Sequence, residues 1–245
     1  VKRMLLTMKS TIEALRRIIY WNAACLDIAA HHPDAAERDK ANDMAALLTP
    51  ISKGWGTDMA VELTGTAVQI HGGMGFIEET GVAQHFRDAR ITTIYEGTNG
   101  IQAMDLVGRK LPMKNGAVVL GLFDEIASID SHLMKHAECV EIATQLRSAL
   151  SAVRTTTQWL MENAGSQTAV LSAASPYLRQ MSVLIGGYVM AKSADMALHS
   201  KMSDEHKAAK IGTARFFCEQ ILPSVHGLSN AVMGDDELLM SFDQT

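Results

Sequence analysis

The residues best suited to chemistry lie between positions 69 and 100, where three glycines in four residues precede an isolated carboxylate, Glu96. Glu96 stands between Tyr95 and Gly97. An aromatic ring on one side and a missing side chain on the other would leave the carboxylate reaching into a cavity. Desolvation there raises the pKa of a carboxyl group toward that of a working base, so Glu96 is a candidate general base. The competing interpretation is a solvated charge ahead of a helix N-terminus, where the helix dipole favours carboxylates.

The glycines themselves, Gly72, Gly73 and Gly75, permit positive φ angles and a close approach of the backbone to another group. They follow a predicted helix, whereas the dinucleotide-binding fingerprint follows a strand, so the pattern is not that motif. The simpler interpretation is a helix end and a tight turn. Further along, we expect Arg87 and Asp88 to form a salt bridge that anchors the loop.

Metal chemistry is not indicated. His132 and His136 lie four residues apart and could share an ion on a helix, but no third ligand is placed beside them. The cysteines are far apart in helical patterns, at positions 25, 139 and 218. We expect buried thiols in a reducing compartment, and therefore a cytoplasmic protein, in place of a disulfide framework or a zinc site.

The composition favours an all-α protein. Apolar residues make up 47% of the 245 residues but aromatic residues only 5%, and Ala, Leu and Met dominate over strand-forming residues. The net charge of −5 and the absence of Lys/Arg-rich runs argue against a nucleic-acid partner. No apolar run reaches the roughly 18 residues that a membrane span needs.

The elements that must position these residues are helices with two kinds of texture. In the first part, apolar periodicity and capping residues predict helices over residues 1–31, 34–71, 77–86 and 98–111, with an extended segment at 91–94. Thr98 or Asn99 caps the last of these, and Pro50 is expected to kink or break the second. Residues 112–116 are predicted to be a linker.

The second part is predicted to be a plain helical bundle with short loops, and its helices run over residues 117–135, 136–164, 167–200 and 203–233. Pro176 is expected to interrupt the third helix and Pro223 to bend the fourth. The first helix of the chain is already under way at Val1 with neither an initiator Met nor an N-cap, which predicts a piece of a longer protein.

Several separated blocks in a fixed order carry a family resemblance: Gln69-Ile-His-Gly-Gly-Met-Gly-Phe76, Arg87-Asp88-Ala89-Arg90, Ile94-Tyr-Glu-Gly-Thr98 and Ile101-Gln102. Over residues 1–111 the chain resembles the C-terminal helical domain of acyl-CoA dehydrogenases, with the first helix of that domain missing. Residues 117–245 resemble the additional C-terminal helical domain of a large-subunit branch, which includes enzymes for 3-methylthiopropanoyl-CoA.

This resemblance implies a flavin-dependent reaction. In the family, the Glu that matches Glu96 removes the pro-R proton from Cα of an acyl-CoA thioester, and the β-hydride passes to N5 of FAD to give a trans-2-enoyl-CoA. Some branches carry the base on an earlier helix, and a Glu at position 96 indicates the common placement. Tyr95 and Gly97 would line the acyl pocket.

The same resemblance implies a shared cofactor site. Gln69, Gly72 and Gly73 would contact the ADP half of an FAD held mainly by a neighbouring subunit, and Thr98 would contact the flavin of its own subunit. A homodimer or a dimer of dimers is therefore expected, with electron-transfer flavoprotein as the acceptor. Gly100 departs from the family, since many members have a Gln near the cofactor at that position.

Two alternatives remain open on the sequence. One is an acyl-CoA oxidase, which passes electrons to O₂, and the other is a helical interaction module that kept the fold and lost the chemistry. Because the N-terminal helical domain and the β-domain of the family are absent, we expect the 245-residue chain alone neither to bind FAD tightly nor to turn over.

Overall fold

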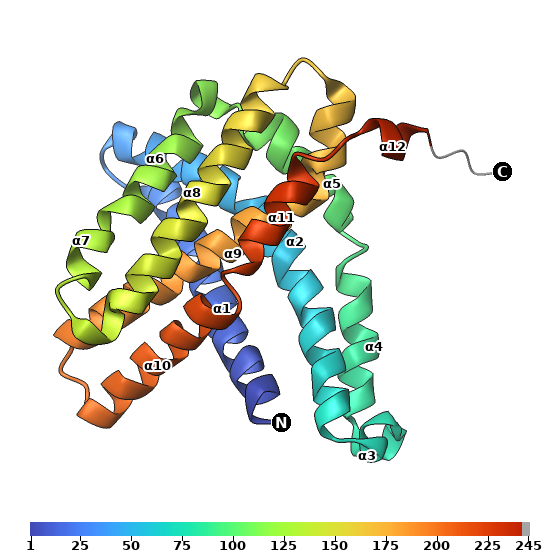
Figure 1. Cartoon of the computed structure of the whole chain (residues 1–245), viewed down its shortest axis with the longest axis vertical. Coiled ribbons are helices and arrows are strands. Elements are labelled where there is room, and N and C mark those ends of the chain that lie inside the picture. The colour runs from blue at the N-terminus through green and yellow to red at the C-terminus, as the bar shows by residue number, and fades with distance from the viewer. Residues whose placement is uncertain (242–245) are drawn as a thin grey trace.

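The computed structural model describes residues 1–241 as helices joined by short turns, and these residues contain no strand (Figure 1), which confirms the all-α prediction. The first two helices are the longest, α1 (Lys2–His31) and α2 (Ala35–Ile70). The predicted end of the first helix at His31 is confirmed, because Pro33 holds His32 in an extended conformation. Asp34 caps α2 by accepting a hydrogen bond from the Ala36 amide at 2.9 Å. In a capping box, the side chain three residues after the N-cap, here Glu37, accepts a hydrogen bond from the main-chain amide of the N-cap. The main-chain amide of Asp34 donates to His32 Nδ1 instead.

Two prolines do not break their helices: the interruption predicted at Pro176 is wrong, and so is a break at Pro50, where a kink or a break was predicted. Pro50 lies inside α2 and Pro176 inside α9 (Gln167–His199), and both helices continue through them. Each proline removes one intrahelical hydrogen bond. Each is followed by a fully buried residue, Ile51 and Tyr177, so the packing of the helix fixes its path. Pro223 does divide the predicted final helix into α10 (Asp204–Gln220) and α11 (Ser224–Val232).

The segment after α2 forms short helices, α3 (Gly73–Phe76), η1 (Glu78–Thr80), α4 (Val82–Thr92), α5 (Asn99–Asp105) and η2 (Leu106–Lys110). The predicted extended segment at 91–94 is wrong, because its first two residues complete α4 and Thr93 is still helical. The hydroxyls of Thr92 and Thr93 donate to the carbonyls of Ala89 and Arg90, at 2.6 and 3.1 Å, which suits a helical turn.

The rest of the described chain is η3 (Met113–Gly116), α6 (Ala117–Ser128), α7 (Asp130–Leu133), η4 (Ala137–Cys139), α8 (Val140–Glu162), α9, α10, α11 and α12 (Glu237–Met240). The single helix predicted over 117–135 is therefore two helices. His132 belongs to α7 whereas His136 lies beyond it, so the two histidines do not share a helix face.

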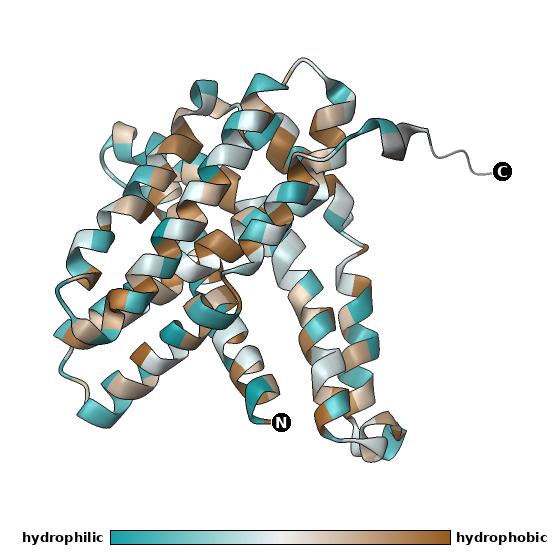
Figure 2. Ribbon diagram, viewed as in Figure 1, coloured by the Kyte–Doolittle hydropathy of each residue, from teal (hydrophilic) through white to brown (hydrophobic). Residues whose placement is uncertain are grey.

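Helix α9 is the centre of the molecule. It packs against α1, α2, α5, α8, α10 and α11, and its residues from Gln180 to Ala191 are all buried, as expected for a helix covered on every side. One continuous cluster of buried apolar side chains extends from Ala14 in α1 to Val232 in α11, and Met113 in the predicted linker packs against it. Figure 2 shows apolar residues concentrated where these helices meet.

Away from this core, α2 and α4 run side by side as an arm with α3 at its tip (Figure 1). No helix within residues 1–241 has the length and apolar character to cross a membrane.

Candidate active site at the loop between α4 and α5

The glycine turn forms the tip of the arm. Gly72 follows the end of α2 with a φ of 62°, a conformation that favours glycine, and its amide donates to the Gln69 carbonyl at 3.1 Å. Gly75 packs so closely on α2 that a Cβ atom there would lie 2.2 Å from the Val68 carbonyl oxygen. Gly73 has neither constraint, since a Cβ there would meet no atom within 4 Å. The predicted positive φ and close backbone approach are thus confirmed, each at a different glycine.

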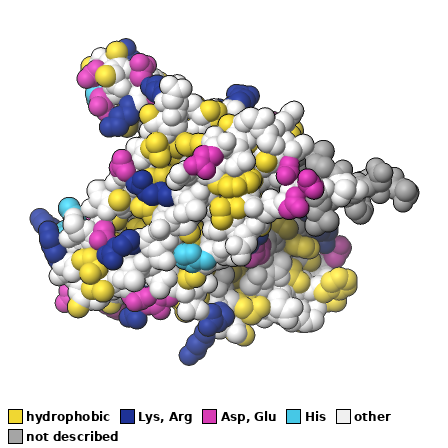
Figure 3. Space-filling model, turned by 45° about the horizontal axis from the view of Figure 1, so that its top comes forward, with side chains coloured by type: hydrophobic (Ala, Val, Ile, Leu, Met, Phe, Trp, Pro, Cys, Tyr) yellow, Lys and Arg dark blue, Asp and Glu magenta, His cyan; other side chains and the backbone are white. Residues whose placement is uncertain are grey.

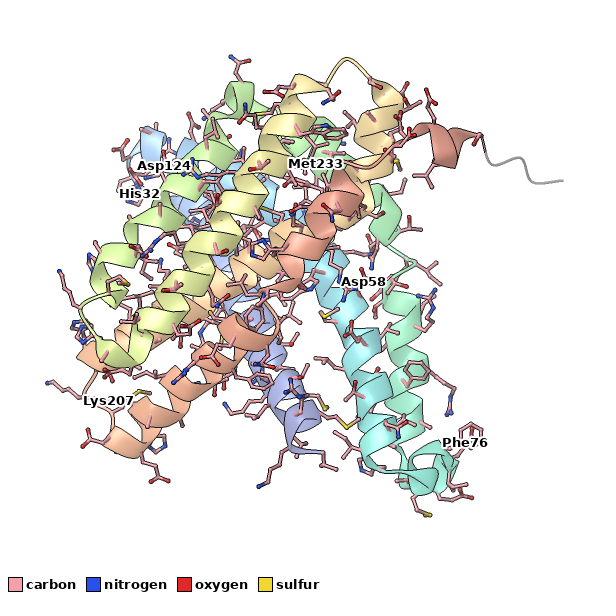
Figure 4. The ribbon with its side chains drawn as sticks, in the orientation of Figure 1. His32, Asp58, Phe76, Asp124, Lys207 and Met233 are labelled. Carbon is pink, nitrogen blue, oxygen red and sulfur yellow. The ribbon has the colours of Figure 1, made fainter. Side chains whose placement is uncertain are left out.

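Apolar side chains at this tip are exposed. Phe76 is 81% exposed and points away from the body of the molecule (Figure 4), and Met74 is also exposed.

The predicted Arg87–Asp88 ion pair is wrong, because Arg87 pairs across the turn with Glu78 at 3.4 Å. Successive helical residues point in different directions, whereas Glu78 lies on the turn that α4 packs against.

Glu96 lies in the loop between α4 and α5, and its backbone is strained. Its φ is 55°, a left-handed conformation that costs a non-glycine residue about 1–2 kcal/mol. Gly97 is also left-handed, with a φ of 79°. Such strain persists only where neighbouring contacts hold the loop, and it concentrates at functional sites.

Those contacts come from the start of α5. Thr98 is the N-cap and accepts from the Ile101 amide at 3.3 Å, which confirms the predicted cap. The side chain of Gln102 donates to the Glu96 carbonyl at 3.3 Å. The main-chain N–H of Asn99 donates to the Thr93 carbonyl at 3.2 Å, which closes the loop onto the end of α4.

The Asn99 side chain attaches this loop to α2. It accepts from Lys53 Nζ at 2.8 Å and donates to the Gly54 carbonyl at 3.1 Å and to the Asp58 carboxylate at 2.6 Å. Asp58 is labelled on α2 in Figure 4, beside the start of α5. The sequence pattern offered Asn99 only as an alternative helix cap, and it gave no signal for partners more than 40 residues away.

The predicted cavity around Glu96 is not formed by the described residues. Both Glu96 and Tyr95 are exposed, and Tyr95 is 53% exposed. The predicted site residues also form two groups. Tyr95, Glu96, Gly97 and Thr98 share the loop, while Gln69, Gly72 and Gly73 lie at the other end of α4, whose eleven residues span about 16 Å.

Elsewhere, the predicted free, buried thiols are confirmed at all three cysteines. Burial raises the pKa of the Cys139 thiol to about 11, with a smaller contribution from the Glu138 charge, so this thiol is inert at neutral pH. Among the described residues, no group of three or more His, Cys, Asp or Glu side chains is placed to hold a metal ion.

Two protein-family models match this chain. The model of the acyl-CoA dehydrogenase C-terminal domain matches residues 1–111, and a model described as acetyl-CoA dehydrogenase C-terminal like matches residues 122–243. The chain therefore belongs to the acyl-CoA dehydrogenase family and corresponds to a C-terminal part of it.

Among individual relatives, the 3-methylmercaptopropionyl-CoA dehydrogenase of Ruegeria pomeroyi is 40% identical over 228 residues, which cover 91% of this chain and 38% of the relative. A structure of Caenorhabditis elegans ACDH-11 in complex with C11-CoA has a TM-score of 0.77 at 21% identity and covers 99% of this chain and 40% of its own. A Bacillus anthracis acyl-CoA dehydrogenase complexed with FAD has a TM-score of 0.73 at 18% identity, covering 98% and 44%. At these identities the two structures establish the fold. The chain spans about two fifths of the length of the relatives it matches.

Proposed function

We propose that this chain is part of an FAD-dependent acyl-CoA dehydrogenase that oxidises an acyl-CoA to the trans-2-enoyl-CoA, with Glu96 as the base that removes the α-proton. The observation that carries the proposal is the position of Glu96 in a strained loop held by Gln102 and Asn99. A base must be fixed relative to the proton it removes, and this loop supplies that constraint. The acyl-CoA dehydrogenase named among the relatives supports the same activity.

The exposure of Glu96 defines what the rest of the site must supply. A carboxylate becomes a stronger base when it is desolvated, and neither Tyr95 nor Gly97 covers it in this chain. We therefore propose that the bound thioester and the remainder of a longer protein close over the loop, with Tyr95 and Gly97 lining the acyl chain. On its own, the 245-residue chain is expected to be inactive.

The residues assigned to FAD fit a cofactor in their accessibility. A ligand can approach the backbone of Gly73 closely, because the space where a side chain would stand is empty, and Gln69 is exposed beside it. Thr98 is exposed and keeps its hydroxyl proton available, since the oxygen acts as an acceptor in the cap. When bound, FAD supplies the acceptor for the β-hydride.

The two groups of residues lie at opposite ends of α4, so we propose that they serve different FAD molecules. Thr98 would contact the flavin of its own subunit, and Gln69, Gly72 and Gly73 the ADP half of an FAD in a neighbouring subunit. This arrangement requires at least a homodimer. Electron-transfer flavoprotein as acceptor, a cytoplasmic location and a domain division at residues 112–116 belong to the same proposal.

The test is anaerobic reduction of the flavin in the longer protein by acyl-CoA substrates. Glu96→Gln keeps the size and hydrogen bonding of the side chain but removes the base, so bleaching should slow by several orders of magnitude while ligand still binds. The matched control is Glu79→Gln, which removes an exposed carboxylate at the tip of the arm and should leave the rate unchanged. Equal bleaching of Glu96→Gln and wild type would place the base elsewhere, and peroxide formation by the wild type would indicate an oxidase.

A further inference from the structure

A cavity lies between α1, α9 and α10, away from the loop that carries Glu96. Its volume is about 580 Å³, within the range of small-molecule sites. None of its lining residues belongs to the stretch from 69 to 100. Much of its wall is apolar, formed by Trp21, Val189, Met196, Ala197 and Met202. Met196 is 68% exposed, which leaves an unbranched, adaptable side chain at the opening.

The charged residues of this cavity are all cations. Arg17, Lys192 and Lys210 line it, and no carboxylate does. Lys210 Nζ and Arg17 Nη1 lie 2.8 and 3.4 Å from the same oxygen, Oε2 of Glu13, and Arg17 Nη2 also donates to Ser193 Oγ at 2.7 Å. These contacts hold the two cationic groups side by side at one edge of the cavity.

Glu13 cannot neutralise its surroundings. Lys9 also pairs with this carboxylate, so three cations converge on one anion and leave an excess of positive charge. Lys192 is different, because it has a carboxylate of its own in Glu125 at 3.5 Å. Figure 3 shows charges of both signs interspersed over one face of the molecule, which is the ordinary arrangement on a protein surface.

We propose that this cavity binds an anionic amphiphile, a carboxylate carrying an alkyl chain. The carboxylate would bridge Arg17 and Lys210, whose side chains are 29% and 33% exposed and therefore reachable from water. Charge-assisted hydrogen bonds of this kind are about twice as strong as neutral ones. The alkyl chain would lie against Trp21 and the two methionines. A neutral or cationic amphiphile would make the same apolar contacts but would not be attracted by the excess positive charge.

The experiment is a titration of the purified chain with decanoate, decanol and decyltrimethylammonium, followed by tryptophan fluorescence. Trp21 is a reporter in the cavity wall, whereas neither Trp55 nor Trp159 lines the cavity, so the signal should disappear in Trp21→Phe. Decanoate should give a saturable change at least about tenfold tighter than the other two, as one added charged hydrogen bond predicts. Equal binding of all three amphiphiles, or no response to decanoate, overturns the proposal.

Two matched variants locate the carboxylate. Lys210→Met removes a cation that lines the cavity, and Lys9→Met removes one that pairs with the same Glu13 but lies outside it. We expect decanoate binding to weaken about tenfold in the first and by less than about twofold in the second, with decanol binding unchanged in both. Equal losses would show that the cluster only stabilises the helices. If the cavity instead receives a helix from a second copy of the chain, sedimentation velocity will show a dimer that decanoate does not dissociate, and the proposal fails.

Discussion

The side-chain amide of Asn99 donates a hydrogen bond to the main-chain carbonyl of Gly54, 3.1 Å away. The same side chain accepts from Lys53, and the Asn99 main chain donates to Thr93. One residue thus ties the end of α4, the start of α5 and the middle of α2 together. Glu96 lies within the loop that these bonds close, so its position relative to α2 depends on Asn99.

Asn99→Ala should lower the free energy of unfolding of the chain by about 1–3 kcal/mol, because several polar groups lose their hydrogen bonds to the Asn99 side chain. Urea unfolding followed by circular dichroism measures this. Asn42→Ala is the control, since Asn42 is exposed on the same helix α2 and should change stability by less than about 0.5 kcal/mol.

In the longer flavoprotein, a role in positioning Glu96 makes a further prediction for Asn99→Ala. The rate of flavin reduction at saturating acyl-CoA should fall by about tenfold or more while KM changes little, because the base is misplaced and the binding surface is retained. A rise in KM with an unchanged maximal rate would argue against positioning.

The φ of 55° at Glu96 predicts a conflict between stability and catalysis. Glu96→Gly should raise the free energy of unfolding by about 0.5–1 kcal/mol, because relief of the left-handed strain exceeds the entropy gained by the unfolded chain. The same variant should abolish flavin reduction. Thermal unfolding of Glu96→Gln provides the comparison: it lacks the base but keeps the strain, so its Tm should match the wild type, and an equal rise in both would refute the explanation.

The sequence predicted correctly the features that depend on neighbouring residues, and it failed where residues far apart in the chain decide the structure. Helix ends set by neighbours, such as Pro33 after α1 and Thr98 before α5, were predicted correctly because the cap and the capped amide lie within three residues. Breaks at Pro50 and Pro176 do not occur, since burial of the residue after each proline outweighs one lost hydrogen bond.

The same reasoning applies to the candidate site. Glu96 and the glycines could be selected from local residue types, but their separation by the length of α4 could not, because the segment at 91–94 was taken as extended. The bonds from Asn99 to α2 cross more than 40 residues and have no periodic signature. The strain at Glu96 likewise depends on those bonds and is not visible in residue types.

Substitution by alanine should destabilise the chain at Gly75 but not at Gly73. Gly75→Ala places a Cβ 2.2 Å from the Val68 carbonyl, so the tip must shift, and we expect a loss of at least about 1 kcal/mol in unfolding free energy. Gly73→Ala meets open space and should be neutral or slightly stabilising. If Gly73 faces FAD in the longer protein, its alanine variant should weaken FAD binding without lowering Tm, as measured by cofactor release on dilution. Unchanged FAD affinity would remove Gly73 from the cofactor site.

Glu13 should make the stability of the chain depend on pH in the acidic range. Burial alone raises the pKa of Glu13, but its bonds to Lys210 and Lys9 outweigh that effect and lower the pKa to about 2 from 4.5. Because the folded value lies below the unfolded one, the contribution of Glu13 is complete above about pH 4.5 and is lost as the pH falls toward 2. Because the Glu13 side chain is only 16% exposed, we expect the free energy of unfolding to fall by on the order of 2 kcal/mol over this interval.

Urea midpoints between about pH 5.5 and 2.5 should therefore fall less steeply in Glu13→Gln than in the wild type, while Glu138→Gln, at an exposed carboxylate, should follow the wild type. Parallel curves for Glu13→Gln and wild type would show that the cluster does not couple protonation of Glu13 to folding.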